Sequence, residues 1–266
     1  MDQETSNDGG DEGKLNAMIS SGSDIAGGAI GAAVGFLFGG PAGAAIGGAS
    51  GPAAAAAIKK IGHEATGKLL GPREKVRVGG AIAIAAAHIR ARTECGEKLR
   101  TDGFFENRHN GRSDAEEVAE SVLLRSQREA EERKIPLMAY LIGNISFNNQ
   151  ISAQLAHQII RTADSMTYRQ LCIMKLAAFS QNYPLRKTDY RGQSRFEKVQ
   201  YQVLYECLDL YHRALVNFGG DVAFGPTDVK PASMQLQGVG ADIFNEMGLV
   251  TIPEGDLLPI AEQLSG

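Results

Sequence analysis

The sequence contains no tryptophan, and aromatic residues make up only 6% of its 266 positions. Such a chain cannot build its core mainly from bulky aromatic side chains. It contains 32 glycines instead, and an apolar content of 43% that is ordinary for a globular protein. Because small residues let backbones approach closely, this composition favours tightly packed helices. The length is sufficient for one large domain or two small ones.

Cysteine is also scarce, since Cys95, Cys172 and Cys207 are widely spaced and no CxxC pair is present. The odd number and the spacing argue against a disulfide framework and a zinc site, and they fit a reducing cytoplasm. The first residues, MDQETSNDGGDEGK, are acidic and polar where a signal peptide has a basic start and an apolar run. We therefore expect a cytoplasmic protein that is not secreted by that route.

Charge is absent from residues 25–58, although the chain has a formal net charge of -4. Residues 1–23 are expected to be a disordered acidic arm, because they hold almost nothing that could be buried. Residues 59–100 contain ten Lys/Arg against four Glu. An uncharged segment followed by a basic one is typical of chains beside an anionic membrane surface, and a solvated helix face is the alternative. The basic positions expected at that surface are Lys59, Lys60, Lys68, Arg73, Lys75 and Arg77.

The uncharged segment carries seven glycines at a spacing of four. They are Gly27, Gly31, Gly35, Gly39, Gly43, Gly47 and Gly51. On an α-helix a step of four residues advances by about 400°, so this glycine stripe rotates by roughly 240° over its length. One straight helix therefore cannot present all seven glycines to one partner. Pro41 and Pro52 suit the first positions of new helices, which predicts packed helical hairpins built from helices over 24–38, 42–49 and 52–70.

The residues between these glycines argue against a flexible linker, which would hold polar residues at irregular spacing. They include Ile30, Val34, Phe36, Leu37, Phe38 and Ile46. Seven large apolar residues over this segment contribute only roughly 2 to 4 kcal/mol to insertion. The pieces between the prolines are also shorter than the ~20 residues that cross hydrocarbon. We therefore expect a segment that packs through its glycines and enters a membrane as an assembly. A soluble Gly/Ala core is the alternative.

The glycine run resembles the glycine-zipper segments of bacterial membrane-associated and pore-related proteins over about 30 residues, and this resemblance is specific to a packing mode. Three further stretches are similar in style to helical proteins of bacterial abortive-infection defence of the Abi-alpha type. They are EERKIPLMAYLIGNISF, MTYRQLCIMKLAAF and IFNEMGLVTIPEGDLLPIAEQL. Together the resemblances imply a bacterial two-part protein that is membrane-active at one end and senses a partner at the other.

The rest of the chain is expected to be helical. A helix is predicted from Pro72, with a strand over 76–84 as the alternative because VRV and AIAI alternate with a period of two. The loop at 101–112 makes a plausible domain boundary. Ser113 and Glu116 then form a capping box at the start of an amphipathic helix.

Further helices are expected from Pro136, around Ile151, Leu155 and Ile159, and through MTYRQLCIMKLAAF. A long helix over 194–218 completes the bundle. It is predicted to bury Phe196, Val199, Val203, Cys207, Leu210 and Leu215.

The fold predicted from these patterns is mainly α, with a glycine-zipper segment at 24–100, an α-helical bundle at 113–218 and a small mixed α/β element at 219–266. In that last element SMQLQ and LVTI are expected to pair as short strands around a helix at GADIFNEM, and GDLLPIAEQL closes the chain. Without a basic recognition helix, we expect no nucleic-acid partner.

Motifs for catalysis are incomplete. GHEATGKL at 62–69 nearly matches GxxxxGK[ST], but a leucine replaces the hydroxyl that binds Mg²⁺. His63 and Glu64 lack the second histidine of a zinc helix. GVGAD at 238–242 begins like a dinucleotide fingerprint without the βαβ unit, and it favours a tight entry into a helix. His88 is interpreted as a buried polar anchor, with a pH-sensitive switch as the alternative. We therefore expect no enzyme, no metal site and no cofactor.

Three functional hypotheses follow from the sequence. The first is a bacterial protein at the inner membrane whose glycine stripe self-associates and permeabilises lipid in phage defence, with a cytosolic helical part that oligomerises or senses a protein partner. The second is a soluble all-α interaction module with no membrane role. The third, an enzyme whose site is assembled only in the tertiary structure, has the least support from the sequence.

Overall fold

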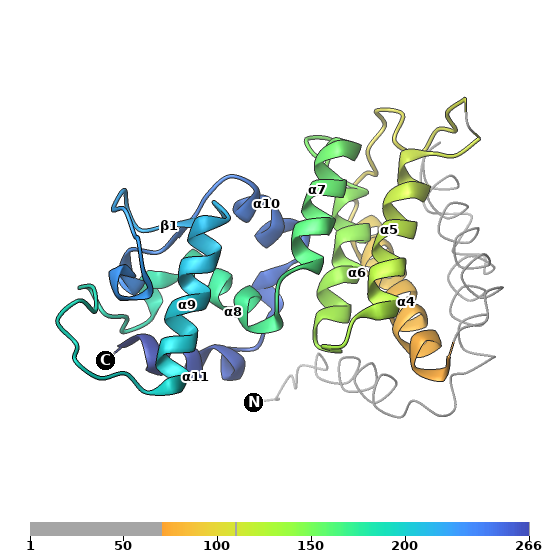
Figure 1. Ribbon diagram of the computed structural model, residues 1–266. Coiled ribbons are helices and arrows are strands. Elements are labelled where there is room, and N and C mark those ends of the chain that lie inside the picture. The colour runs from red at the N-terminus through yellow and green to blue at the C-terminus, as the bar shows by residue number, and fades with distance from the viewer. Residues whose placement is uncertain (1–70, 110, 266) are drawn as a thin grey trace, which may run out of the picture. The chain divides into compact units, whose positions relative to one another are not determined.

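The computed structural model describes residues 71–109 and 111–265. They form two compact units, unit 1 up to His157 and unit 2 from Gln158 (Figure 1). The boundary lies within α7 (Ala153–Asp164). Helices dominate both units, and the strands found in these residues form one two-stranded sheet in unit 2. The predicted fold class, mainly helical with a small mixed C-terminal region, is therefore confirmed.

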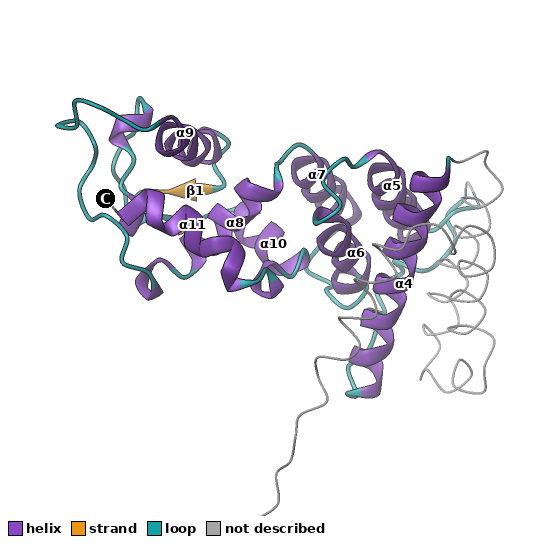
Figure 2. Cartoon of the chain, turned by 90° about the horizontal axis from the view of Figure 1, so that it is seen from below, coloured by secondary structure: helices purple, strands orange, loops and turns teal. Residues whose placement is uncertain are grey.

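Unit 1 is built around α4 (Pro72–Glu94), α5 (Asp114–Arg128) and α6 (Lys134–Ile145). Each of these helices packs against the other two, and Figures 1 and 2 show them side by side. Their shared core is made of aliphatic side chains. It includes Val78, Ile82, Ile89, Val118, Val122, Leu137, Leu141 and Ile145.

The helix predicted from Pro72 is confirmed, and the strand alternative over 76–84 is wrong. Proline lies in the first turn of α4, where the missing N–H would have no partner within the helix. The helix ends at Glu94, because the chain turns at Gly96, whose φ of 87° is a left-handed conformation that glycine adopts without strain.

Small residues set the approach of α4 to α6. Ala81 and Ala85 of α4 and Ala139 of α6 have no exposed surface, and Gly143 of α6 is buried. Each helix thus presents a pair of small residues four positions apart, which lie on one face of an α-helix. The Gly/Ala-rich part of α4 is therefore covered by another helix of the same unit.

A capping box with a side-chain N-cap begins one helix in each unit, α5 in unit 1 and α8 in unit 2. Ser113 Oγ accepts from the Glu116 N–H at 3.2 Å, and the Ser113 N–H donates to the Glu116 carboxylate at 3.0 Å, which confirms the predicted capping box. In unit 2 Thr167 and Gln170 form a second one, with distances of 3.2 and 2.9 Å. Pro136 lies in the first turn of α6, which begins two residues earlier than predicted.

Unit 2 centres on α8 (Tyr168–Ala178), which packs against α9 (Lys198–His212), α10 (Val239–Glu246) and α11 (Glu254–Ser265). Four short 3-10 helices lie between these elements. They are η1 (Ser180–Asn182), η2 (Pro226–Asp228), η3 (Pro231–Ser233) and η4 (Leu249–Thr251).

The long helix predicted over 194–218 is shorter in the structure, since α9 covers only Lys198–His212. It ends because Ala214 takes a left-handed φ of 55° and the chain turns into β1 (Val216–Asn217). Phe196 lies before the helix and is half-buried. Val199 was predicted to be buried but is 50% exposed, whereas the other four predicted core residues of this stretch are buried.

The strand pairing of the tail also differs from the prediction. β2 (Gln235–Leu236), within SMQLQ, pairs antiparallel with β1. LVTI forms η4 instead of a strand, because Gly248 ends α10 in a left-handed conformation and the chain closes into a 3-10 turn. The nearby Gln237 N–H also donates to the Leu215 carbonyl at 3.1 Å, which extends the contact between the two strand regions.

The acidic arm at 1–23 and the helices predicted over 24–70 lie outside the described residues. The loop at 101–112, where a domain boundary was predicted, belongs to unit 1 and contacts α5 through the Ala115 N–H, which donates to the Phe104 carbonyl at 3.0 Å. The predicted domain limits remain predictions.

Candidate functional site

The basic positions predicted beside the glycine stripe are described from Arg73 onward. Arg73 is exposed, whereas Lys75 and Arg77 are half-buried. Arg77 Nη1 donates to the Gln127 carbonyl at the end of α5 at 3.3 Å, and its Nε lies 3.9 Å from Glu132. This cation therefore lies at the C-terminus of α5, where the helix dipole favours positive charge.

The other predicted site residues fall outside the described residues. These are the seven glycines of the stripe together with Lys59, Lys60 and Lys68. The near match to a phosphate-binding loop at 62–69 also lies there.

The start of α4 is fixed by Glu74. Its carboxylate accepts from the Gly71 N–H at 2.7 Å and from Gln127 Nε2 at 3.2 Å. The Gly71 backbone hydrogen bond lowers the pKa of Glu74, with Gln127 adding to the effect. The start of α4 is thus held to α5 and the turn that follows it by Glu74 and Arg77.

His88 of α4 contacts α6 and anchors the packing of these two helices. Its Nε2 is 2.7 Å from Asn144 Oδ1, and its ring meets the Tyr140 ring edge at a centroid distance of 4.8 Å. The same Asn144 oxygen accepts from Arg92 Nη1 at 2.9 Å. Because that oxygen is an acceptor for Arg92, we infer that His88 Nε2 carries the proton and donates.

Arg92 extends this cluster to the surface. Its guanidinium makes two bonds to the Glu97 carboxylate, at 3.0 and 2.5 Å, and lies 4.2 Å above the Phe147 ring. Hydrogen bonding to Arg92 is the main cause that lowers the pKa of Glu97. The cluster ties α4 to α6 through hydrogen bonds to Asn144, so it is best explained as a packing contact.

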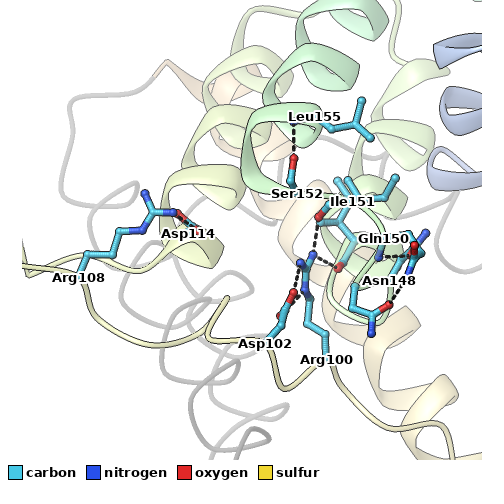
Figure 3. A network of polar contacts seen from close by, with 11 residues as sticks. Arg100, Asp102, Arg108, Asp114, Asn148, Gln150, Ile151, Ser152 and Leu155 are labelled. Atoms are coloured by element: carbon cyan, nitrogen blue, oxygen red, sulfur yellow. Dashed lines mark hydrogen bonds and ion pairs between the residues drawn. The ribbon is translucent and has the colours of Figure 1, made fainter.

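Arg100 is the hub of a second polar network (Figure 3). Its guanidinium, almost fully buried, donates to the Ile145 and Ile151 carbonyls at 3.3 and 2.8 Å. It also binds Asp102 through two bonds of 2.8 and 2.5 Å and stacks on the Phe104 ring at 4.2 Å. Arg100 thereby joins the end of α6, at Ile145, to the residue Ile151 that precedes α7.

The neighbouring side chains of this network act on the backbone of the same turns. Asn148 Oδ1 accepts from the Gln150 N–H at 3.0 Å, and Ser152 Oγ accepts from the Leu155 N–H at 3.2 Å at the start of α7 (Figure 3). Arg108 pairs with Asp114 in the first turn of α5. Each of these groups forms a hydrogen bond or an ion pair within unit 1, so we interpret the network as structural.

Unit 2 contains a loop clasp that the sequence analysis missed. Asp228 Oδ2 accepts from the backbone N–H groups of Phe224 and Gly225 at 2.8 and 3.1 Å, while Asp228 Oδ1 accepts from Arg191 Nε at 2.7 Å. The Tyr190 N–H donates to the Thr227 carbonyl at 2.8 Å. We call these two connected segments, 186–198 and 221–228, the Asp228 clasp.

The clasp holds apolar side chains away from the core. Phe224 is 83% exposed and Val222 is 59% exposed. These two side chains, two positions apart, place apolar surface at the tip of this loop. The Arg191 hydrogen bond is the main cause that lowers the pKa of Asp228, so this carboxylate is ionised and keeps its ordering hydrogen bonds at neutral pH.

No described residues form a group of three or more side chains that could hold a metal ion. Among the helices of residues 71–109 and 111–265, none is long and apolar enough to span a bilayer. Comparison of the chain with protein-family models, with curated proteins and with solved structures found no match.

Proposed function

We propose that this chain is a bacterial membrane-associating protein, in which the glycine stripe drives self-association and the helical units anchor and regulate it. The observation that carries the proposal is the sequence of residues 25–58, where seven glycines at a spacing of four alternate with large apolar residues and no charge interrupts them. Small residues at this spacing let helices approach closely in lipid, where packing and weak hydrogen bonds drive association.

The packing of α4 against other helices restricts which residues are available to contact a membrane. The Gly/Ala-rich middle of α4 packs against α5 and α6, so it is used inside unit 1. Residues 25–58 then remain as the segment that we propose for assembly. Permeabilising a membrane during phage defence is the activity that we propose for the assembled segment.

A soluble interaction module is the second candidate, and the packing of α4 favours it. In α4 the same Gly/Ala composition contributes to a protein core: Ala81 and Ala85 have no exposed surface. By extension, residues 25–58 would pack through their glycines against protein and not lipid.

Fractionation of cells that express the full chain separates the two candidates. We expect the chain to sediment with membranes, and Gly35→Leu to increase the fraction found in the supernatant, because a bulky side chain keeps helix backbones apart. Gly35→Ala keeps a small side chain and is the matched control, which should stay with membranes. A wild-type chain that remains in the supernatant at every expression level would contradict the membrane proposal and favour the soluble module.

A further inference from the structure

We infer that the Asp228 clasp of unit 2 is a second, peripheral membrane contact that docks on an anionic lipid surface. The inference rests on the proposed function, because it names a further contact with the same membrane. It is carried by two exposed apolar side chains on an ordered loop and by exposed cations on the segment bonded to that loop.

The apolar side chains are held in position by the backbone. Asp228 fixes the N–H groups of Phe224 and Gly225, and Lys230 Nζ pairs with Asp221 at 2.6 Å at the other end of the loop. Phe224 and Val222 therefore project from a loop whose conformation is already set. A preordered loop loses little conformational freedom when it docks, which favours binding.

The cations come from the partner segment of the clasp. Lys187, Arg195 and Lys198 are exposed, and no carboxylate of the described residues pairs with them. Arg191 anchors this segment to Asp228. In Figure 1 the two segments lie side by side at the end of unit 2 that carries the C mark.

Aromatic residues lie within and next to the cationic segment of the clasp. Phe196 contacts Tyr201 at a centroid distance of 5.8 Å, and Tyr201 and Tyr205 expose 45% and 61% of their surface on α9. Tyrosine suits the boundary between lipid headgroups and hydrocarbon, while lysine and arginine attract anionic headgroups. Carboxylates at Asp189 and Glu197 lie within the same segment, and this mixed charge favours a lipid surface over a nucleic acid, which needs a denser cationic face.

Co-sedimentation of the full chain with vesicles tests the inference. Vesicles of phosphatidylcholine with phosphatidylserine should bind the chain more tightly than vesicles of phosphatidylcholine alone. Phe224→Ser should weaken binding about tenfold. Replacing Lys187, Arg195 and Lys198 by glutamine should remove the preference for phosphatidylserine and the sensitivity to salt.

The matched control is Val250→Ser, since Val250 of η4 is 56% exposed in the same unit but lies outside the clasp. Each variant is also measured together with Gly35→Leu. Gly35→Leu should keep the part of the vesicle binding that the clasp provides, and a further loss of this binding with Phe224→Ser supports the clasp. Vesicle binding by Gly35→Leu equal to that of wild type would count against the glycine stripe and not against the clasp.

Two results would overturn the inference. One is that Phe224→Ser binds vesicles as tightly as Val250→Ser does. The other is that the clasp variants lose binding to a fluorescent single-stranded oligodeoxythymidine while their binding to vesicles is unchanged, which would assign the surface to nucleic acid.

Discussion

Gly143 of α6 lies directly against His88 of α4. A Cβ atom built on Gly143 would be 2.5 Å from His88 Cδ2 and 3.3 Å from Cγ of the same ring. His88 in turn is held by Asn144, the residue after this glycine. The absence of a side chain at one position therefore allows both the close approach of the two helices and the hydrogen bond that fixes it.

Gly143→Ala should destabilise unit 1 by about 1 to 3 kcal/mol, because the added methyl group displaces the His88 ring from a packed contact. Urea unfolding followed by circular dichroism measures this change. Gly192→Ala is the control, since a Cβ at that exposed position meets nothing within 4 Å. If the two variants unfold at the same urea concentration, the close contact between Gly143 and His88 does not contribute to stability.

Gly240→Ala should be more damaging, by about 3 kcal/mol or more, because the new Cβ would lie 2.1 Å from the Leu215 carbonyl oxygen. A backbone atom cannot rotate away as a side chain can. Thermal unfolding measures the effect against Gly255→Ala in α11, where the Cβ has open space. A wild-type melting temperature for Gly240→Ala would mean that α10 does not approach the Leu215 backbone this closely.

Arg100→Met should cost about 2 to 4 kcal/mol of unfolding free energy, since the Ile145 and Ile151 carbonyls and Asp102 all lose a charged donor. Methionine keeps much of the side-chain volume, so the loss reports on the polar contacts. Lys98→Met, two residues earlier and exposed, is the matched control. If both variants unfold at the same urea concentration, the Arg100 network contributes nothing to stability.

Acid should weaken the Asp228 clasp. The pKa of Asp228 is lowered from its ordinary value of 3.8, chiefly by the Arg191 hydrogen bond, so the folded protein binds this proton less tightly than the unfolded chain does. The stabilising contribution is complete above the ordinary pKa and is lost as the pH falls through the lowered one. Asp228→Asn should therefore be less stable than wild type at pH 6, and the difference should shrink toward pH 2.

Denaturant midpoints over that pH range check this expectation, with the exposed Glu262→Gln in α11 as the control. A difference between wild type and Asp228→Asn that grows as the pH falls would have the wrong sign for this carboxylate.

Local signals in the sequence predicted the helix starts well. Proline at the start of α4 and the pair Ser113 and Glu116 act within one helical turn, so their effect is visible in a short stretch. Gly238, directly before α10, has a φ of 49°, which agrees with the tight helix entry that GVGAD indicated. These features depend mainly on backbone geometry, which residue type constrains strongly.

The clasp and the Arg100 network were missed because they join residues that are far apart in sequence. Arg191 and Asp228 are 37 positions apart, and Arg100 and Ile151 are 51 apart. No periodicity connects such pairs. The exposure of Val199 was missed for a related reason, since periodicity identifies an apolar position but not whether another element covers it.

The central claim, that the glycine stripe assembles in membranes, is tested most directly by dye release from vesicles that contain phosphatidylserine. Wild type and Gly35→Ala should release the dye, and Gly35→Leu should not, because only the bulky side chain prevents close helix packing. Gly255→Leu, which adds the same side chain at an exposed position of α11 outside the clasp, should behave as wild type does. Equal dye release by Gly35→Leu and wild type, at equal protein concentration, would contradict the claim.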